Sequence, residues 1–364
     1  MKIRLIVAML LACLCSQLYA AEFSLFGDAK VVFDNDAKTT YFELGELDFT
    51  LYEDLSETSS VTADIIYAKS EHGYEIDVER LLITKKVHDL FSVTLGKFHK
   101  PVGFWLHNFH HASLSQDTIT SPFFLENDET HEGVFPTHLI GLLFEGIGKA
   151  WSYQFGVVNS NGINTENSQV PDFTTSIETI NGKDPSKEKT VIGRLTFGPR
   201  SWPVEFGLFA MQNDVVETGE TNTLVEPGKA VFEQLVYGLD INLRTRYFYL
   251  FGEYIDMAFK DNADINQPPF VASVEDYNAQ AFYAQLGVYL GDHLTAAVRY
   301  ESLDFEENST YFDIQGILPE TRKILAFKYK FDDSNALRFE VNDAHRNEQE
   351  DVTYYSLQWF FYLL

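Results

Sequence analysis

The chain has 364 residues, and its 54 acidic residues outnumber its 27 basic residues, which gives a formal net charge of −27. This excess of negative charge repels the phosphates of nucleic acids, so we expect no nucleic-acid partner. No apolar run reaches the roughly 18 residues of a membrane-spanning helix. The 31 Phe and 19 Tyr residues favour strands instead.

The N-terminus has the pattern of an export signal. Lys2 and Arg4 form a short basic region, residues 5–14 form an apolar one, and a small-residue cleavage site follows. We therefore expect a signal peptide, residues 1–20, and a single mature domain, residues 21–364. The protein would be exported and would reside in the outer membrane of the cell.

Both cysteines of the chain, Cys13 and Cys15, lie within this leader. The mature chain is therefore expected to use neither disulfides nor thiol chemistry. A lipoprotein leader that is cleaved before Cys13 is the alternative interpretation, although its apolar core would be short.

From Phe23 onward, apolar residues recur at every second position in short segments. In 335–342, for example, Leu337, Phe339 and Val341 lie on one face of an extended strand and polar residues lie on the other. One face suits hydrocarbon and the other suits water. Sixteen such segments can be counted, each about the length that a tilted strand needs to cross a bilayer. Clear examples cover 47–51, 151–157, 191–197, 235–242, 294–301 and 325–331.

The connections between these segments alternate between short and long. Short turns are predicted at 87–90, 146–149, 198–203, 244–245, 291–293 and 332–334. Long connections are predicted at 34–40, 68–74, 98–137, 159–188, 213–233, 259–278, 304–321 and 345–352. Bacterial outer-membrane barrels combine an even strand number with short periplasmic turns and long outer loops. We therefore predict an all-β fold, a transmembrane up-and-down antiparallel β-barrel of about 16 strands.

A soluble β-sandwich or solenoid with one buried face is the alternative fold. Such a sandwich would need neither so many outward-facing Phe and Tyr residues nor a regular alternation of short and long links. The barrel explains both features.

Two motifs resemble a known family. The segment Leu95–Trp105, LGKFHKPVGFW, and the later segment Gly133–Gly141, GVFPTHLIG, resemble Gram-negative outer-membrane porin-like proteins related to the phosphate-selective porin O and P family. The resemblance implies a 16-stranded barrel, commonly a homotrimer, whose third long loop folds inward to narrow the pore. Phosphate selectivity is not expected, because a multiply charged anion leaves water only for cationic partners and this chain is strongly acidic.

Charged strand residues on the predicted inner face are expected to line the pore. They are Glu46, Asp48, Asp77, Glu79, Arg80, Arg194, Glu205, Asp240, Arg299, Glu301, Lys328, Lys330, Arg338 and Glu340. Rings of carboxylates favour cations, so the sequence predicts a cation preference. The alternative is that acidic residues in the outer loops bridge divalent cations and lipopolysaccharide at the cell surface.

The third long connection, 98–137, is the longest and is expected to constrict the pore. The predicted constriction residues are His99, His107, His110, His111, Asp117, Glu126, Asp128, Glu129, His131, Glu132 and His138. A helical turn across Phe104 to His111 would place His107, His110 and His111 on one side. Imidazole with carboxylate suits zinc, copper, nickel or iron. Alternatively, these histidines hydrogen-bond the loop to the barrel wall beside its aromatic residues.

Two functions therefore remain open. The first is a porin, a water-filled diffusion channel for small hydrophilic solutes or ions, with outer-membrane lipid and lipopolysaccharide as its surroundings. The second is a dedicated uptake channel or receptor for a transition metal or metal chelate that uses the histidine-rich loop. No cofactor is expected beyond a weakly bound divalent metal. An enzyme is not expected, because no G-x-S-x-G or comparable nucleophile motif occurs.

Overall fold

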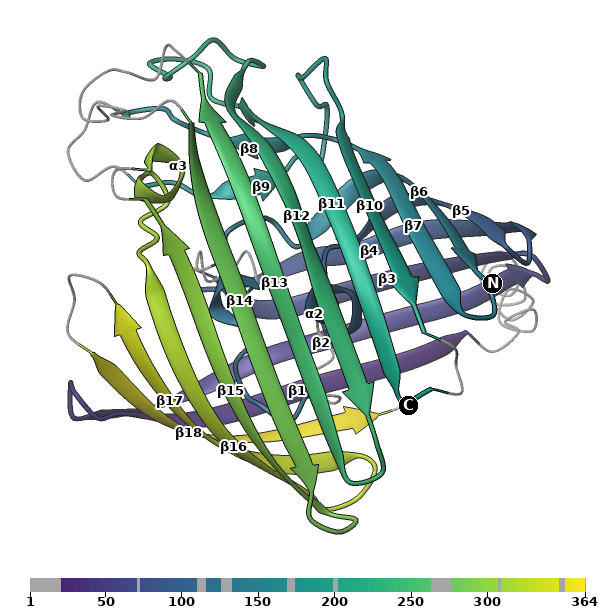
Figure 1. The fold of residues 1–364 in the computed structure, drawn as a ribbon, viewed down its shortest axis with the longest axis vertical. Helices are drawn as coiled ribbons and strands as arrows, with labels where there is room; N and C mark the ends of the chain where they lie inside the picture. Colours follow the sequence, from purple (N-terminus) through teal and green to yellow (C-terminus); the bar gives the residue numbers. More distant parts are fainter. Residues whose placement is uncertain are drawn as a thin grey trace, which may run out of the picture.

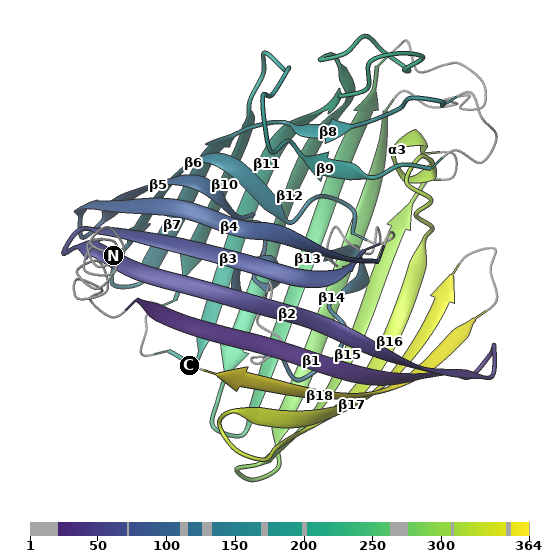
Figure 2. The ribbon, with the colours of Figure 1, turned by 180° about the vertical axis from the view of Figure 1, so that it is seen from behind.

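The computed structural model describes residues 21–70, 73–109, 116–125, 133–168, 174–198, 202–262, 276–306, 309–346 and 351–363. This part of the chain forms a closed antiparallel β-barrel of 16 strands (Figures 1 and 2). The predicted fold class and strand number are confirmed. In chain order the strands are β1 (Glu22–Asp34), β2 (Thr39–Ser56), β3 (Ser59–Ser70), β4 (Gly73–His88), β5 (Phe91–His99), β6 (His138–Ile147), β7 (Trp151–Val158), β10 (Thr190–Phe197), β11 (Val204–Glu217), β12 (Ala230–Arg244), β13 (Phe248–Asp261), β14 (Asp276–Tyr289), β15 (Leu294–Phe305), β16 (Glu320–Lys330), β17 (Asn335–Arg346) and β18 (Val352–Leu363).

The sheet closes because the first and last strands pair. Leu25 lies opposite Leu363 and Asp34 lies opposite Tyr354 in the antiparallel pair of β1 and β18. Each remaining barrel strand is hydrogen-bonded to its neighbours on both sides. A closed sheet leaves no edge of unpaired backbone groups, which is what hydrocarbon requires of a spanning sheet.

Short elements lie in the connections. Two strands of three residues, β8 (Asn161–Ile163) and β9 (Ile177–Thr179), belong to the link between β7 and β10. The helical elements are α2 (Trp105–Asn108), the 3-10 turn η1 (Phe123–Leu125) and α3 (Thr310–Asp313). None of the helices in the described residues is long and apolar enough to cross a membrane.

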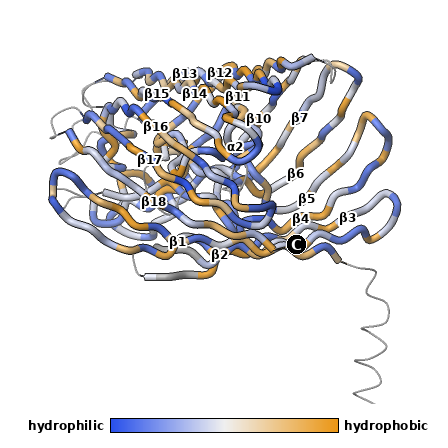
Figure 3. The backbone as a smooth tube through the Cα atoms, turned by 90° about the horizontal axis from the view of Figure 1, so that it is seen from below, coloured by the Kyte–Doolittle hydropathy of each residue, from blue (hydrophilic) through white to orange (hydrophobic). Residues whose placement is uncertain are grey.

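The two faces of the strands differ as the alternating sequence predicts. On β12, Leu235, Tyr237 and Leu239 are exposed on the outer surface, whereas Val236 and Asp240 are buried inside the barrel. Figure 3 shows the same alternation of hydrophobic and hydrophilic positions along the wall. The outer face therefore offers an apolar surface for lipid.

Short links join the strands where the short turns are predicted, although residues 199–201 of the turn at 198–203 lie outside the described part of the chain. Two predicted long connections are wrong. The link between β1 and β2 consists only of residues 35–38. The Asp34 carboxylate accepts the backbone N–H groups of Asp36 and Ala37, and Lys38 adopts a left-handed φ of 55°, so the chain reverses direction in a tight turn. Between β3 and β4 the pairing continues up to Ser70 and Gly73. Both connections are as tight as the turns at the opposite rim.

Two adjacent parts of the interior wall differ in character. Buried apolar side chains point inward from β11 to β14, among them Phe209, Met211, Val236, Ile255 and Met257. Buried charged or polar side chains point inward from β15 to β18, among them Arg299, Arg322, Lys328, Arg338, Glu340 and Gln358. The third loop, which connects β5 to β6, contacts both of these parts.

Candidate functional site

The first part of the third loop is an apolar segment, residues 102–109, that packs on β13 and β14. Phe104 and Phe109 lie against Phe251, with ring centroids 4.8 and 5.4 Å away, and Trp105 meets Tyr283 edge-on at 5.4 Å. These aromatic side chains are almost fully buried. Burial of this much aromatic surface stabilises the segment against the wall.

One wall carboxylate sits beneath this apolar segment. Glu253 on β13 accepts the backbone N–H of Trp105 and the hydroxyl of Tyr283, the latter at 2.8 Å. Gly103 passes so close that a Cβ there would lie 1.8 Å from the Glu253 carboxylate, and its φ is +65°. Only glycine meets both demands at this position.

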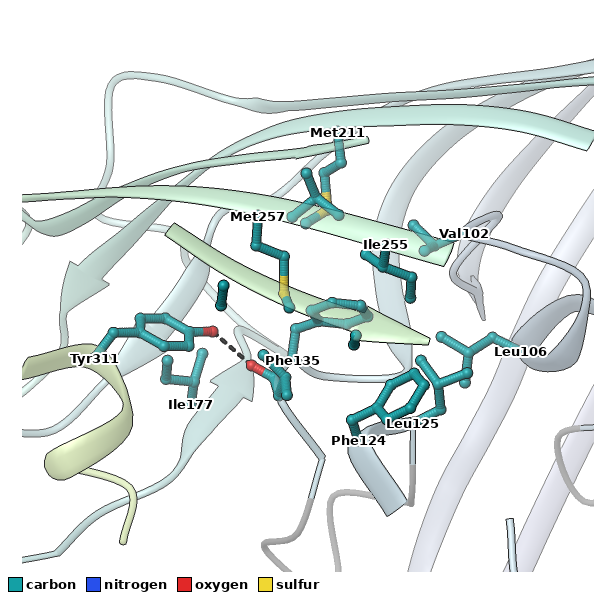
Figure 4. Close-up of a cluster of buried hydrophobic side chains, with 14 of the residues drawn as sticks. Val102, Leu106, Phe124, Leu125, Phe135, Ile177, Met211, Ile255, Met257 and Tyr311 are labelled. Carbon is teal, nitrogen blue, oxygen red and sulfur yellow. Dashed lines mark hydrogen bonds between the residues drawn. The ribbon is translucent and has the colours of Figure 1, made fainter. Parts of the chain in front are cut away.

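Other hydrophobic loop residues continue this packing. Figure 4 shows Val102, Leu106, Phe124, Leu125 and Phe135 of the third loop beside Met211, Ile255 and Met257 of the wall. The aromatic residues of the loop, Phe104, Trp105, Phe109, Phe123 and Phe124, are all buried.

The second part is a polar segment, residues 116–123, whose backbone is bound by cations of β15, β16 and β17. Lys328 Nζ donates to the Gln116 carbonyl at 2.8 Å, and Arg338 Nη1 donates to the Thr118 carbonyl at 2.7 Å. Arg299 Nη2 donates to the carbonyls of Thr120 and Ser121 at 2.8 and 2.9 Å, and its Nη1 donates to the Thr118 hydroxyl. A loop without regular structure needs such partners for its backbone.

Two carboxylates complete this arrangement. Glu340 accepts the N–H groups of Ile119 and Thr120, at 2.6 and 3.3 Å, and also the Thr120 hydroxyl at 2.8 Å. Glu301 accepts the N–H of Phe123 at 2.8 Å. Charged wall side chains thus bind both the donors and the acceptors of this segment, and hydrogen bonds to charged groups are stronger than neutral ones.

Several residues predicted to line the pore form ion pairs. Arg194 and Asp240 pair at 2.8 Å, Arg299 contacts Glu301, and Lys328 lies 3.4 Å from Asp117 of the loop. The ion pairs of Arg194 and Arg299 are buried, so the positive charge of each arginine is largely cancelled by its carboxylate partner. Net charge alone therefore overstates the field in the barrel.

The β3–β4 region accounts for more of the predicted lining. Arg80 contacts Asp64, and Asp77 lies 3.1 Å from Lys97. The register shifts between Val78 and Arg80, so that Glu79 is an extra, bulged residue. A bulge changes which side chains share a face, and Glu79 pairs instead with His138.

The remaining predicted lining residues are more dispersed. Asp48 is buried, while Glu46 and Glu205 are half-buried. Glu46 donates its backbone N–H to the Asp28 carboxylate at 3.1 Å. Lys330 lies at the β16–β17 turn, is exposed, and is 3.9 Å from Asp333.

Four of the predicted constriction residues lie in the described part of the chain: His99, His107, Asp117 and His138. The rings of His99 and His138 are 5.3 Å apart, and His138 Nε2 is 2.7 Å from Glu79. This histidine pair joins the ends of β5 and β6 to β4 and is a wall contact. The other seven residues lie outside the described part of the chain: His110, His111, Glu126, Asp128, Glu129, His131 and Glu132.

Of the three histidines in the predicted metal group, only His107 lies in the described part of the chain. It lies in α2, which ends at Asn108, so the predicted helical turn across 104–111 is observed only over Trp105–Asn108. Enclosure by the barrel and the positive charge of Arg194 lower the pKa of His107 to about 4, although part of the residue contacts solvent. Its imidazole is therefore neutral at pH 7. Among the described residues, no group of three or more His, Cys, Asp or Glu could hold a metal ion.

The outer loops also contact the third loop. The hydroxyl of Tyr311 in α3 donates to the Val134 carbonyl at 2.6 Å (Figure 4). The Tyr311 N–H is in turn bound by the Tyr277 hydroxyl at 2.9 Å. Tyr311 is fully buried among Phe232, Phe259 and Phe312. The connection between β15 and β16 is thus joined to the end of the third loop.

Sequence reasoning missed several interior acids. Among them, Asp28, Asp64 and Glu253 all contact other interior groups. Asp28 lies where the register of β1 and β2 shifts, and Glu253 lies among aromatic residues on both strand faces. The available signal for Glu253 was that it is the one charged residue in the aromatic-rich stretch 247–255.

No protein-family model and no curated sequence matches the chain. Solved structures do match over nearly its full length. The anion-selective porin from Comamonas acidovorans has a TM-score of 0.64 and 12% identity, covering 94% of this chain and 99% of that one. The outer-membrane channel DcaP of Acinetobacter baumannii has a TM-score of 0.62 and 10% identity, covering 94% and 97%.

A third neighbour is the trimer form of OmpT, an outer-membrane protein of Vibrio cholerae, with a TM-score of 0.59 and 10% identity, covering 94% of this chain and 99% of that one. At these identities the likeness shows the fold. The chain has the barrel of Gram-negative outer-membrane porins. Membership in the phosphate-selective group stays a prediction.

Proposed function

We propose that the protein is an outer-membrane porin, a diffusion channel for small hydrophilic solutes or ions. The observation that carries this proposal is the third loop, which is held inside a closed barrel by an apolar contact on one side and charged contacts on the other. A loop fixed in this way sets the size of the passage. The fold shared with known porins and channels supports the same function.

Planar-bilayer recording tests this function. Purified protein should produce stepwise conductance in KCl, and a variant lacking residues 103–124 should give larger steps because the loop no longer occupies the barrel. Protein that inserts into the bilayer but shows no conductance would contradict the proposal.

A modest cation preference is part of the proposal. Asp28, Glu46 and Asp117 are half-buried carboxylates in the interior, close enough for their charges to act on the same arginine, Arg338. Rings of carboxylates favour cations. The reversal potential in a KCl gradient measures the preference, and a potential of the anion-selective sign would contradict it.

Uptake of a transition metal or metal chelate is the second candidate function. One observation favours it: His107 is neutral at pH 7 and partly exposed, which suits a ligand atom. Calorimetry with zinc, copper and nickel tests this candidate. Failure to bind these ions, together with unchanged metal conductance in a triple alanine variant of His107, His110 and His111, would rule it out.

The proposal also includes export, removal of residues 1–20, and a homotrimer surrounded by lipid and lipopolysaccharide. The apolar outer surface of the barrel supports a membrane location. Intact mass spectrometry of protein from outer membranes would give the cleavage position, and crosslinking in those membranes would give the oligomeric state.

A further inference from the structure

Arg338 on β17 differs from the other buried arginines of the barrel. Its side chain is 0% exposed, and Nη1 donates to the Thr118 carbonyl, but Nε and Nη2 have no acceptor among the described residues. By contrast, Arg194 pairs with Asp240 and Arg299 contacts Glu301. A buried cation with unused N–H donors is costly unless an anion or acceptor meets it.

Two further cations lie in the same row of the sheet as Arg338. In the sheet, Lys328 is paired with Arg338, Arg338 with Gln358, and Gln358 with Lys30, so one row crosses β16, β17, β18 and β1. Arg338 lies over the Phe360 ring, with Cζ 4.5 Å from the centroid, and Lys328 Nζ lies 5.5 Å from the same centroid. Packing on this ring holds both cations in place.

The chemistry of these donors selects the ligand. Nε and Nη2 of a guanidinium form a planar fork that matches the two oxygens of a carboxylate. The acids whose charges act on Arg338 are Asp28, Glu340, Asp117 and Glu46. These carboxylates would repel a multiply charged anion such as phosphate far more strongly than a singly charged one.

We propose that Arg338, with Lys328 beside it, binds the carboxylate group of a small monocarboxylate solute. This inference rests on the proposed function, because the solute reaches Arg338 from the barrel interior. The guanidinium is covered by the polar segment, so the ligand binds as residues 116–118 move off Arg338. Its two carboxylate oxygens then accept the Nε and Nη2 hydrogens of the guanidinium.

Calorimetry on the detergent-solubilised full chain tests the site, with sodium benzoate as the probe and inorganic phosphate as the comparison. We expect benzoate to bind and phosphate to bind at least about tenfold more weakly. Arg338→Gln should weaken benzoate binding by about tenfold or more, since it removes a charge-assisted pair of hydrogen bonds. Arg338→Lys, which keeps the charge and loses the fork, should give an intermediate loss.

Arg322→Gln is the matched control. Arg322 is also a buried arginine of the interior, on the neighbouring strand, but it contacts Glu320, which keeps Arg346 as a second partner. Removal of the Arg322 charge should change benzoate affinity by less than about twofold, because a charge that is already paired contributes little to binding at another site. Heat-dependent electrophoretic mobility shows whether each variant is folded, and Arg338→Lys decides the test if Arg338→Gln does not fold.

Absence of benzoate binding to the wild-type protein would overturn the inference, and so would equal losses in Arg338→Gln and Arg322→Gln. Conductance in KCl separates this outcome from failure of the proposed function. If the protein conducts but does not bind benzoate, the channel function is supported and the binding site is rejected. If the protein binds benzoate through Arg338 but does not conduct, the binding site is supported and the channel function is rejected.

Discussion

The two segments of the third loop are held inside the same barrel by different physical interactions. The apolar segment, residues 102–109, is fixed by aromatic packing on β13 and β14, whereas the polar segment, residues 116–123, is fixed by charged side chains of β15, β16 and β17. Aromatic packing involves no ionised group, whereas the polar segment is bound by ionised wall side chains, among them the carboxylates of Glu301 and Glu340. We therefore expect the first contact to determine the position of the loop and the second to determine the permeability beside it.

The largest effect is expected from Trp105→Ala. This change removes the side chain that packs edge-on against Tyr283 and leaves a cavity, which costs about 3–5 kcal/mol for a buried Trp. The apolar segment should loosen, with a lower free energy of unfolding in urea and noisier single-channel currents.

Trp202→Ala is the control for this change, because Trp202 is 63% exposed. It should alter the free energy of unfolding by less than about 0.5 kcal/mol. Equal effects of the two substitutions would contradict the role given to the apolar segment.

Gly103→Ala should have the next largest effect. The left-handed backbone costs a non-glycine residue roughly 1–2 kcal/mol, and the new Cβ would also collide with the Glu253 carboxylate. Gly291→Ala separates these contributions, because Gly291 has a φ of +87° and a Cβ added there would meet nothing within 4 Å. Urea unfolding should show a larger loss for Gly103→Ala, and only this variant should change the conductance. Equal losses would show that the Glu253 contact adds nothing to the backbone cost.

Asp28→Asn tests the polar side of the comparison. Removing one interior carboxylate should lower the cation-to-anion permeability ratio by up to about fivefold, since two unit charges 4 Å apart in water interact by ~1 kcal/mol. Reversal potentials in a KCl gradient measure this ratio. Asp333→Asn, at a fully exposed turn position, should leave it unchanged. A ratio that is insensitive to Asp28 would place selectivity elsewhere.

The smallest effect concerns the protonation of His107. Its pKa in the folded chain is lowered to about 4, compared with 6.5 for an ordinary histidine. At a pH between these two pKa values, the unfolded chain binds a proton at this histidine that the folded chain does not bind. The free energy of unfolding therefore falls as the pH drops from 6.5 toward 4. In NMR spectra of histidine-labelled protein, the resonance lost in His107→Ala should titrate well below pH 6.5. A midpoint near 6.5 would show that the ring is fully solvated.

The parts of this structure that could be predicted depend on local pattern. Alternation along segments such as 235–242 is sufficient to assign the outward face, because lipid and interior make opposite demands on successive residues. The tight turn at 35–38 was missed because its polar residues also suit a long loop. The charged contacts of the polar segment could not be predicted, since Arg299 and Thr118 are far apart in the sequence and meet only after the barrel closes.

The hydrogen bond from Tyr311 to the Val134 carbonyl has a practical consequence for labelling the protein. A peptide tag inserted beside α3 would pull on the end of the third loop and change the current that it was meant to leave alone. The turn at 35–38 is fixed by its own Asp34 carboxylate, so a tag placed there would report on surface exposure without disturbing the channel.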